Sequence, residues 1–81
     1  MKIQVKLFAA ARQFHGEDSI SIELSSDATI GELRTELVRR IPALEPMSHS
    51  LRIAVNSDYA VDDATLNETD ELACIPPVSG G

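Results

Sequence analysis

The sequence predicts an α+β fold in which a mixed β-sheet packs against one main helix. Three observations support this prediction. Residues 2–8 and 19–24 alternate apolar and polar side chains, as half-buried strands do. Residues 29–41 instead repeat apolar side chains at helical spacing. Short apolar runs at 51–55 and 71–75 then follow the helix, each beside turn-forming residues.

The first two strands are predicted to form an antiparallel pair. In the first, Ile3, Val5 and Leu7 share the inward face. A short turn of helix over residues 9–15 follows, and Gly16 ends it, because glycine readily takes the left-handed conformation that closes a helix. The second strand, 19–24, repeats the alternation, so the two strands are expected to lie side by side.

The main helix is predicted from Thr29 to Ile41. Thr29-Ile30-Gly31-Glu32 is a capping box, in which the threonine hydroxyl bonds the third helical N–H and the glutamate reaches back. Pro42 ends the helix because it cannot continue the pattern. The predicted core-facing residues are Ile30, Leu33, Leu37 and Ile41. The residues assigned to the solvated side are Glu32, Arg34, Glu36, Arg39 and Arg40. The last two suit the helix dipole, and a binding role is the alternative.

The rest of the chain is predicted as a loop over 43–50, a strand over 51–55, a brief pairing over 59–61 and a final strand over 71–75. Asp62 and Asp63 are interpreted as loop carboxylates. The long crossover that contains the helix permits a parallel pair involving the terminal strands. This organisation gives a folded domain over residues 1–75 and a tail over residues 76–81.

The composition indicates one small globular domain. The percentages of hydrophobic residues, 43%, and of charged residues, 25%, are ordinary for a globular protein. With only 81 residues, the domain has a small core and little room for an enclosed active-site cavity. The net charge of −6 argues against nucleic acid as a partner, since such binding needs Lys and Arg to neutralise phosphates. It fits a partner with a basic face, or solubility alone. No run is long enough to cross a membrane and no signal peptide is evident, so a cytoplasmic location is expected.

The side chains give no sign of a metal site or of catalysis. Cys74 is the single cysteine, which excludes an internal disulfide or a cysteine metal cluster, and it is expected to be buried and inert. His15 and His49 are far apart in the sequence. The sequence contains neither a phosphate-binding glycine loop nor a Ser/His/Asp grouping. We therefore expect no bound cofactor.

The chain ends with Pro76, Pro77, Val78, Ser79, Gly80 and Gly81. The prolines stop the final strand and stiffen the start of the tail, whereas glycines allow close backbone approach inside another protein's narrow site. The Gly81 carboxylate is ionised at neutral pH and is a poor electrophile. Another enzyme must therefore activate it, most simply by adenylation with ATP.

These features resemble those of the small subunits of molybdopterin synthase, which are sulfur carriers of the MoaD/ThiS type with the β-grasp (ubiquitin-like) fold. The ending P-P-V-S-G-G carries the resemblance most specifically, and residues 6–9, 29–33, 54–59 and 70–75 extend it along the chain. One departure is Thr69, where the family usually has glycine. Threonine tolerates positive φ poorly, which questions the geometry of that turn.

The resemblance implies a sulfur-transfer cycle. A ubiquitin-activating-like adenylyltransferase would adenylate Gly81, and a sulfur donor would convert it to a thiocarboxylate. Residues Pro76, Pro77, Val78, Ser79 and Gly80 would form the partner-binding tail. This tail would enter the large synthase subunit and donate sulfur to cyclic pyranopterin monophosphate. In the family, two small subunits flank a dimer of large subunits, which supply the catalytic side chains.

The residues leave three alternatives open. The chain could be a sulfur carrier of another pathway, such as the thiamine type. It could be a ubiquitin-like protein modifier, which shares the activation chemistry. The third alternative is a plain interaction domain with an irrelevant tail.

Overall fold

The computed structural model describes residues 1–77 of the chain. The predictions made for Val78, Ser79, Gly80 and Gly81 lie outside the described residues. The elements are β1 (Lys2–Leu7), α1 (Ala9–His15), β2 (Ser19–Glu23), α2 (Ile30–Arg40), the 3-10 helix η1 (Pro42–Met47), β3 (Arg52–Val55), β4 (Asp58–Tyr59) and β5 (Leu72–Ile75).

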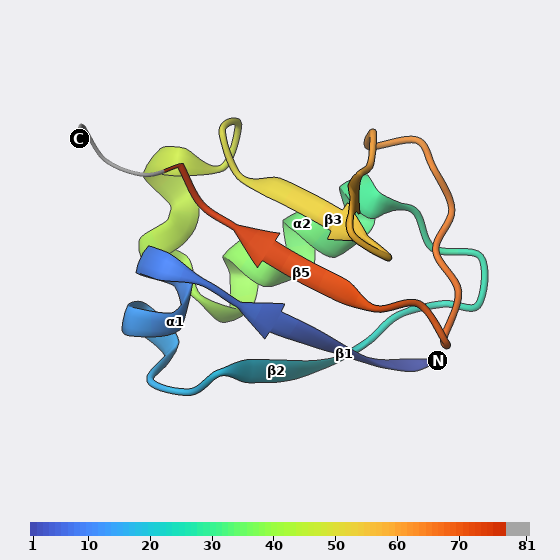
Figure 1. Ribbon diagram of the computed structural model, residues 1–81, viewed down its shortest axis with the longest axis horizontal. Helices are drawn as coiled ribbons and strands as arrows, with labels where there is room; N and C mark the ends of the chain where they lie inside the picture. The colour runs from blue at the N-terminus through green and yellow to red at the C-terminus, as the bar shows by residue number, and fades with distance from the viewer. Residues whose placement is uncertain (78–81) are drawn as a thin grey trace.

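The strands form one mixed sheet in the order β2-β1-β5-β3-β4 (Figure 1). β1 pairs antiparallel with β2 and parallel with β5, which confirms both strand pairings predicted from the sequence. β5 also pairs antiparallel with β3, so the last strand lies at the centre of the sheet. This arrangement is the β-grasp fold.

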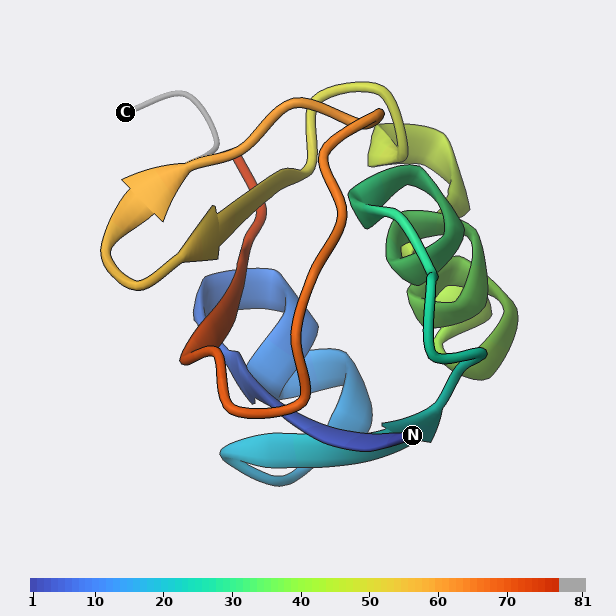
Figure 2. The same ribbon diagram turned by 90° about the vertical axis from the view of Figure 1, so that its right-hand side faces the viewer.

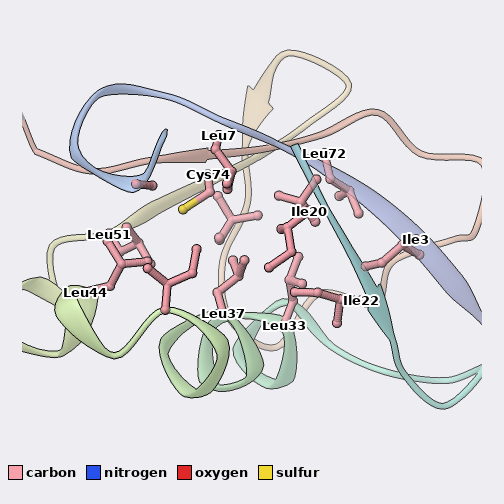
Figure 3. Close-up of a cluster of buried hydrophobic side chains, with 14 of the residues drawn as sticks. Ile3, Leu7, Ile20, Ile22, Leu33, Leu37, Leu44, Leu51, Leu72 and Cys74 are labelled. Carbon is pink, nitrogen blue, oxygen red and sulfur yellow. The ribbon is translucent and has the colours of Figure 1, made fainter. Parts of the chain in front are cut away.

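α2 and η1 lie on one side of the sheet, as Figure 2 shows. β1 alternates strictly between exposed and buried residues, because successive strand side chains point to opposite faces. In Figure 3, Leu33 and Leu37 of α2 point toward the buried side chains of the strands. The largest fully buried side chains are Ile3, Val5, Leu7, Ile22, Ile30, Leu33, Leu37, Leu44, Leu51, Ile53, Leu66 and Cys74.

The start of α2 is held by its own cap and by a distant loop. Thr29 is the N-cap, and its Oγ1 accepts a hydrogen bond from the Glu32 N–H at 3.3 Å, as predicted. The Glu32 carboxylate reaches back as predicted, and it accepts a hydrogen bond from the Thr29 hydroxyl at 3.4 Å. Backbone carbonyls of the loop after β4 accept hydrogen bonds from the first two N–H groups of the helix. The Ile30 N–H donates to the Ala64 carbonyl at 2.9 Å, and the Gly31 N–H donates to the Asp62 carbonyl at 2.8 Å. The loop therefore replaces water at this helix end.

The connecting segments differ from the sequence prediction in two places. The predicted loop over 43–50 contains η1, which begins at Pro42 and buries Leu44. Proline suits the first position of a helix because its missing N–H would be unpaired there anyway. The brief pairing expected at 59–61 falls at Asp58–Tyr59.

Thr69 does not need a left-handed backbone. Within the described residues, the positive φ angles belong to Ala9, Gly16, Asn56 and Ser57. Asn56 and Ser57 form the two-residue turn between β3 and β4, where positive φ at both positions suits a tight hairpin. The concern about the Thr69 turn was therefore wrong.

No helix within residues 1–77 has the length and apolar character needed to cross a membrane.

Candidate functional site

The tail continues directly from the central strand. Leu72 and Cys74 of β5 are buried, whereas Ala73 and Ile75 are half-buried on the opposite face. Pro76 is buried and Pro77, the last residue that the structure describes, is exposed. From Pro77 to Gly81 the chain can span at most about 17 Å. Any site that Gly81 reaches in another protein must therefore lie close to this edge of the fold.

The start of β5 is fixed by Asn56. Its side-chain Oδ1 accepts the Glu71 N–H at 2.9 Å, and its Nδ2 donates to Asp70 Oδ1 at 3.0 Å. The Asn56 backbone N–H donates to the Glu71 carbonyl at 2.8 Å. These bonds anchor β5 to the β3–β4 hairpin just before the strand begins.

The sheet face opposite α2 carries a hollow that apolar side chains line at its centre and that reaches Ile75, the last residue of β5. We call this surface the outer face; its hollow encloses about 310 Å³ and is lined by Lys6, Phe8, Ala54, Tyr59, Ala73 and Ile75, among others. Ala73 pairs with Lys6 on one side and Ala54 on the other, which leaves small side chains at the centre. Phe8 and Tyr59 remain 46% and 61% exposed. Exposed aromatic side chains beside a hollow make the outer face a candidate protein-interaction surface.

A second hollow of about 730 Å³ lies at the base of the tail and has cationic walls. Arg34, Arg52, Pro76 and Pro77 line it, together with Tyr59 and Ile75, which the first hollow shares. The Arg52 guanidinium lies 4.8 Å from the centre of the Tyr59 ring, within the range of a cation–π contact. The described start of the tail, Pro76 and Pro77, therefore borders a basic surface.

The residues that could have formed a separate reactive centre do not do so. Cys74 is fully buried, and burial raises the pKa of its thiol to about 12, which confirms the prediction of a buried, inert thiol. Residues 1–77 hold no cluster of His, Cys, Asp or Glu suited to a metal ion. The Asp62 carboxylate pairs with Arg34 at 2.8 Å.

Two features of this region were not predicted. Arg34 was assigned to the solvated side of the helix, but its side chain is only 19% exposed and bonds to other segments. The sheet surface near the final strand is the predicted docking surface, together with the tail, but the residues that line its hollow were not predicted. A signal for it exists in Leu72-Ala73-Cys74-Ile75, which is apolar at every position and thus on both faces of the strand.

The structure places part of the predicted tail. Pro76 and Pro77 line the second hollow, and Ile75, directly before them, lines both hollows. The other predicted site residues, Val78 to Gly81, are outside the described range, so their roles stay predictions.

Comparison with known proteins identifies the family. The profile of the ThiS family matches residues 5–81. This chain belongs to the ThiS family.

Individual relatives cover the whole length of this ThiS-family chain. It is 38% identical to a molybdopterin synthase sulfur carrier subunit of Arabidopsis thaliana over 81 residues, which are 100% of this chain and 84% of the relative. It is 34% identical to the protein of the same name from Chlamydomonas reinhardtii, with 100% of both chains covered. The small archaeal modifier protein 1 of Haloferax volcanii is 32% identical, with 94% of this chain and 97% of the relative covered. A crystal structure of SAMP1 from Haloferax volcanii covers 100% of both chains at 30% identity, with a TM-score of 0.81.

Proposed function

We propose that this ThiS-family protein is the sulfur carrier subunit of molybdopterin synthase, and that its Gly81 carboxylate is the group that carries sulfur. The observation that supports the proposal most directly is the extent of the family match, which runs through the tail to residue 81. Relatives from Arabidopsis thaliana and Chlamydomonas reinhardtii, which this chain matches over its full length, bear this function in their names.

The proposed chemistry needs no catalytic side chain from this protein. The adenylyltransferase attacks the ATP α-phosphate with the Gly81 carboxylate, which forms the acyl adenylate and releases pyrophosphate. A sulfur donor then displaces AMP and leaves a thiocarboxylate. This terminal sulfur attacks cyclic pyranopterin monophosphate, and water then cleaves the carbonyl–sulfur bond, which leaves the sulfur on the pterin and returns Gly81 as a carboxylate. The described residues fit such a role, since Cys74, the one thiol of the chain, is buried with a raised pKa.

The protein body then acts as the docking element. We propose that the large subunit of molybdopterin synthase covers the outer face while the tail enters its active site. The arrangement supports this because Ile75 borders both the apolar hollow and the base of the tail. A partner seated on the outer face is thus within the short reach of Gly81.

A reconstituted assay tests the proposal. The thiocarboxylated protein is mixed with a matched large subunit and cyclic pyranopterin monophosphate, and molybdopterin is measured. We expect product in proportion to thiocarboxylate consumed, two carriers per molybdopterin. The matched control is the same protein with an unmodified Gly81 carboxylate. Absence of product from the thiocarboxylated protein would overturn the proposal.

A second candidate, a protein modifier, is favoured by the similarity to small archaeal modifier protein 1. In that role the acyl adenylate would react with a lysine amine of a target protein, forming an amide and releasing AMP. Intact-mass analysis of proteins captured from cells separates the candidates. Adducts joined to Gly81 through an amide would support the modifier, whereas a free thiocarboxylate would support the carrier.

A further inference from the structure

Arg34 is hydrogen bonded to three residues in two other segments of the chain. Its Nη1 donates to the carbonyl oxygens of Ser48, at 3.2 Å, and Leu51. Its Nε and Nη2 both donate to Asp62 Oδ1, at 3.2 and 2.8 Å. One guanidinium thus ties α2 to the segment that enters β3 and to the loop after β4.

These segments frame the base of the tail. Leu51 directly precedes Arg52, which pairs with Ile75, the last residue of β5. Arg34 itself lines the basic hollow together with Pro76 and Pro77. Only one strand pairing therefore separates the carbonyl that Arg34 holds from the point where the tail begins.

The position of Asp62 is fixed independently of its carboxylate. The Gly31 N–H donates to the Asp62 carbonyl at 2.8 Å. A Cβ on residue 31 would lie only 3.3 Å from that oxygen, so glycine lets the loop approach α2 closely. The backbone thus presents the carboxylate to Arg34, and removing that carboxylate leaves the backbone contact in place.

We propose that Arg34 is a positioning residue for the tail, which sets the direction in which Pro76 and Pro77 leave the sheet. Arginine suits this task because its planar guanidinium has five donors and can serve two carbonyls and a carboxylate at once. A lysine has a single ammonium group that cannot span these acceptors. The consequence for sulfur transfer rests on the proposed function, but the effect on the tail does not.

The test compares two variants with two matched controls. Arg34→Lys keeps the charge but loses the bridging geometry, and Asp62→Ala removes one anchor of the guanidinium. The controls are Arg39→Lys, on the same helix in a pair with Glu36 where Arg39 is 69% exposed, and Asp63→Ala, an exposed neighbour of Asp62. Asp62→Ala keeps the test decisive if Arg34→Lys fails to fold.

Two measurements are made on each folded variant. Amide resonances of Ile75 and of residues 78–81 report the tail, and kcat and KM report sulfur transfer with the large subunit. We expect Arg34→Lys and Asp62→Ala to shift those resonances and lower kcat by about tenfold or more, because misplacement by about 1 Å can cost on the order of a hundredfold. We expect KM to change by less than about threefold, since docking on the outer face is retained. The controls should match the wild type in both measurements.

Contrary results are equally clear. Unshifted tail resonances in both variants, even with reduced thermal stability, would show that Arg34 has only a structural role and overturn the proposal. Shifted resonances with unchanged kcat would overturn its importance for transfer. If the wild-type protein transfers no sulfur, the proposed function fails, whereas the resonance comparison still decides whether Arg34 positions the tail.

Discussion

Substituting Ala73 by aspartate tests whether the outer face docks the partner. Ala73 lies at the centre of that face, between Lys6 and Ala54. In the free protein the new carboxylate points to solvent beside Lys6. The unfavourable strand propensity of aspartate, up to about 1 kcal/mol, is partly offset by that ion pair, worth about 0.2–1 kcal/mol. We therefore expect the free energy of unfolding to fall by about 1 kcal/mol or less.

In the complex the same carboxylate would lie at the centre of a desolvated interface. Disruption at such a central position typically costs at least about 2 kcal/mol, which corresponds to roughly a thirtyfold weaker Kd. Isothermal titration with the large subunit measures Kd, and urea denaturation measures stability. Ala43→Asp is the matched control, since Ala43 is exposed on η1, away from the outer face. A Kd within twofold of the wild type for Ala73→Asp would refute this docking geometry.

Three other predictions concern the tail, the thiol and the helix cap. Adding one glycine after Gly81 should change the free energy of unfolding by less than about 0.5 kcal/mol, yet lower sulfur transfer by about a hundredfold, because the carboxylate moves by about 3.5 Å; unimpaired transfer would show that Gly81 is not the reacting end. Burial raises the pKa of the Cys74 thiol from its ordinary value of 9.0 to about 12, so the thiol should resist alkylation in the native protein. The unfolded chain releases this proton at lower pH than the folded protein does, so the free energy of unfolding should fall progressively as the pH rises from 9 to 12. In urea denaturation, the Cys74→Ala variant should lose less of its free energy of unfolding over that pH range than the wild type. Thr29→Ala removes the helix cap and should destabilise by about 1 kcal/mol, seen as a melting temperature lower by about 4–8 °C; an unchanged melting temperature would mean that the loop carbonyls alone hold the helix start.

Periodicity predicted the regular elements because each one is dominated by local rules. The alternation in residues 2–8 and the helical spacing after Thr29 correspond to β1 and α2 within one or two residues. The parallel pairing of β1 and β5 also followed, since a helix-containing crossover permits it. The failures were at η1 and at β4, which are short and depend on tertiary contacts.

The candidate site was predictable in its tail and in the strand beside it. The proline and glycine composition pointed to residues 76–81, and the short reach of the tail pointed to the sheet surface near the final strand, but the sequence did not show which residues line that surface. The make-up of this surface depends on the central position of β5 in the sheet, and on Ala73 and Cys74 lying on opposite faces of that strand. Arg34 was missed for a similar reason. Its acceptors, Ser48, Leu51 and Asp62, lie 14 to 28 residues away in the sequence, beyond the reach of any local pattern.

The central, parallel placement of β5 has a mechanical consequence. The N-terminus and the end of β5 lie at opposite ends of the sheet (Figure 1). Tension applied to the tail therefore runs along β5, and the ladders with β1 and β3 resist it in shear, with many hydrogen bonds loaded at once. A strand at a sheet edge pulled across its ladder would instead lose its bonds one by one. A partner that grips the tail, or a protease that pulls on it, would thus meet the most resistant direction of the fold.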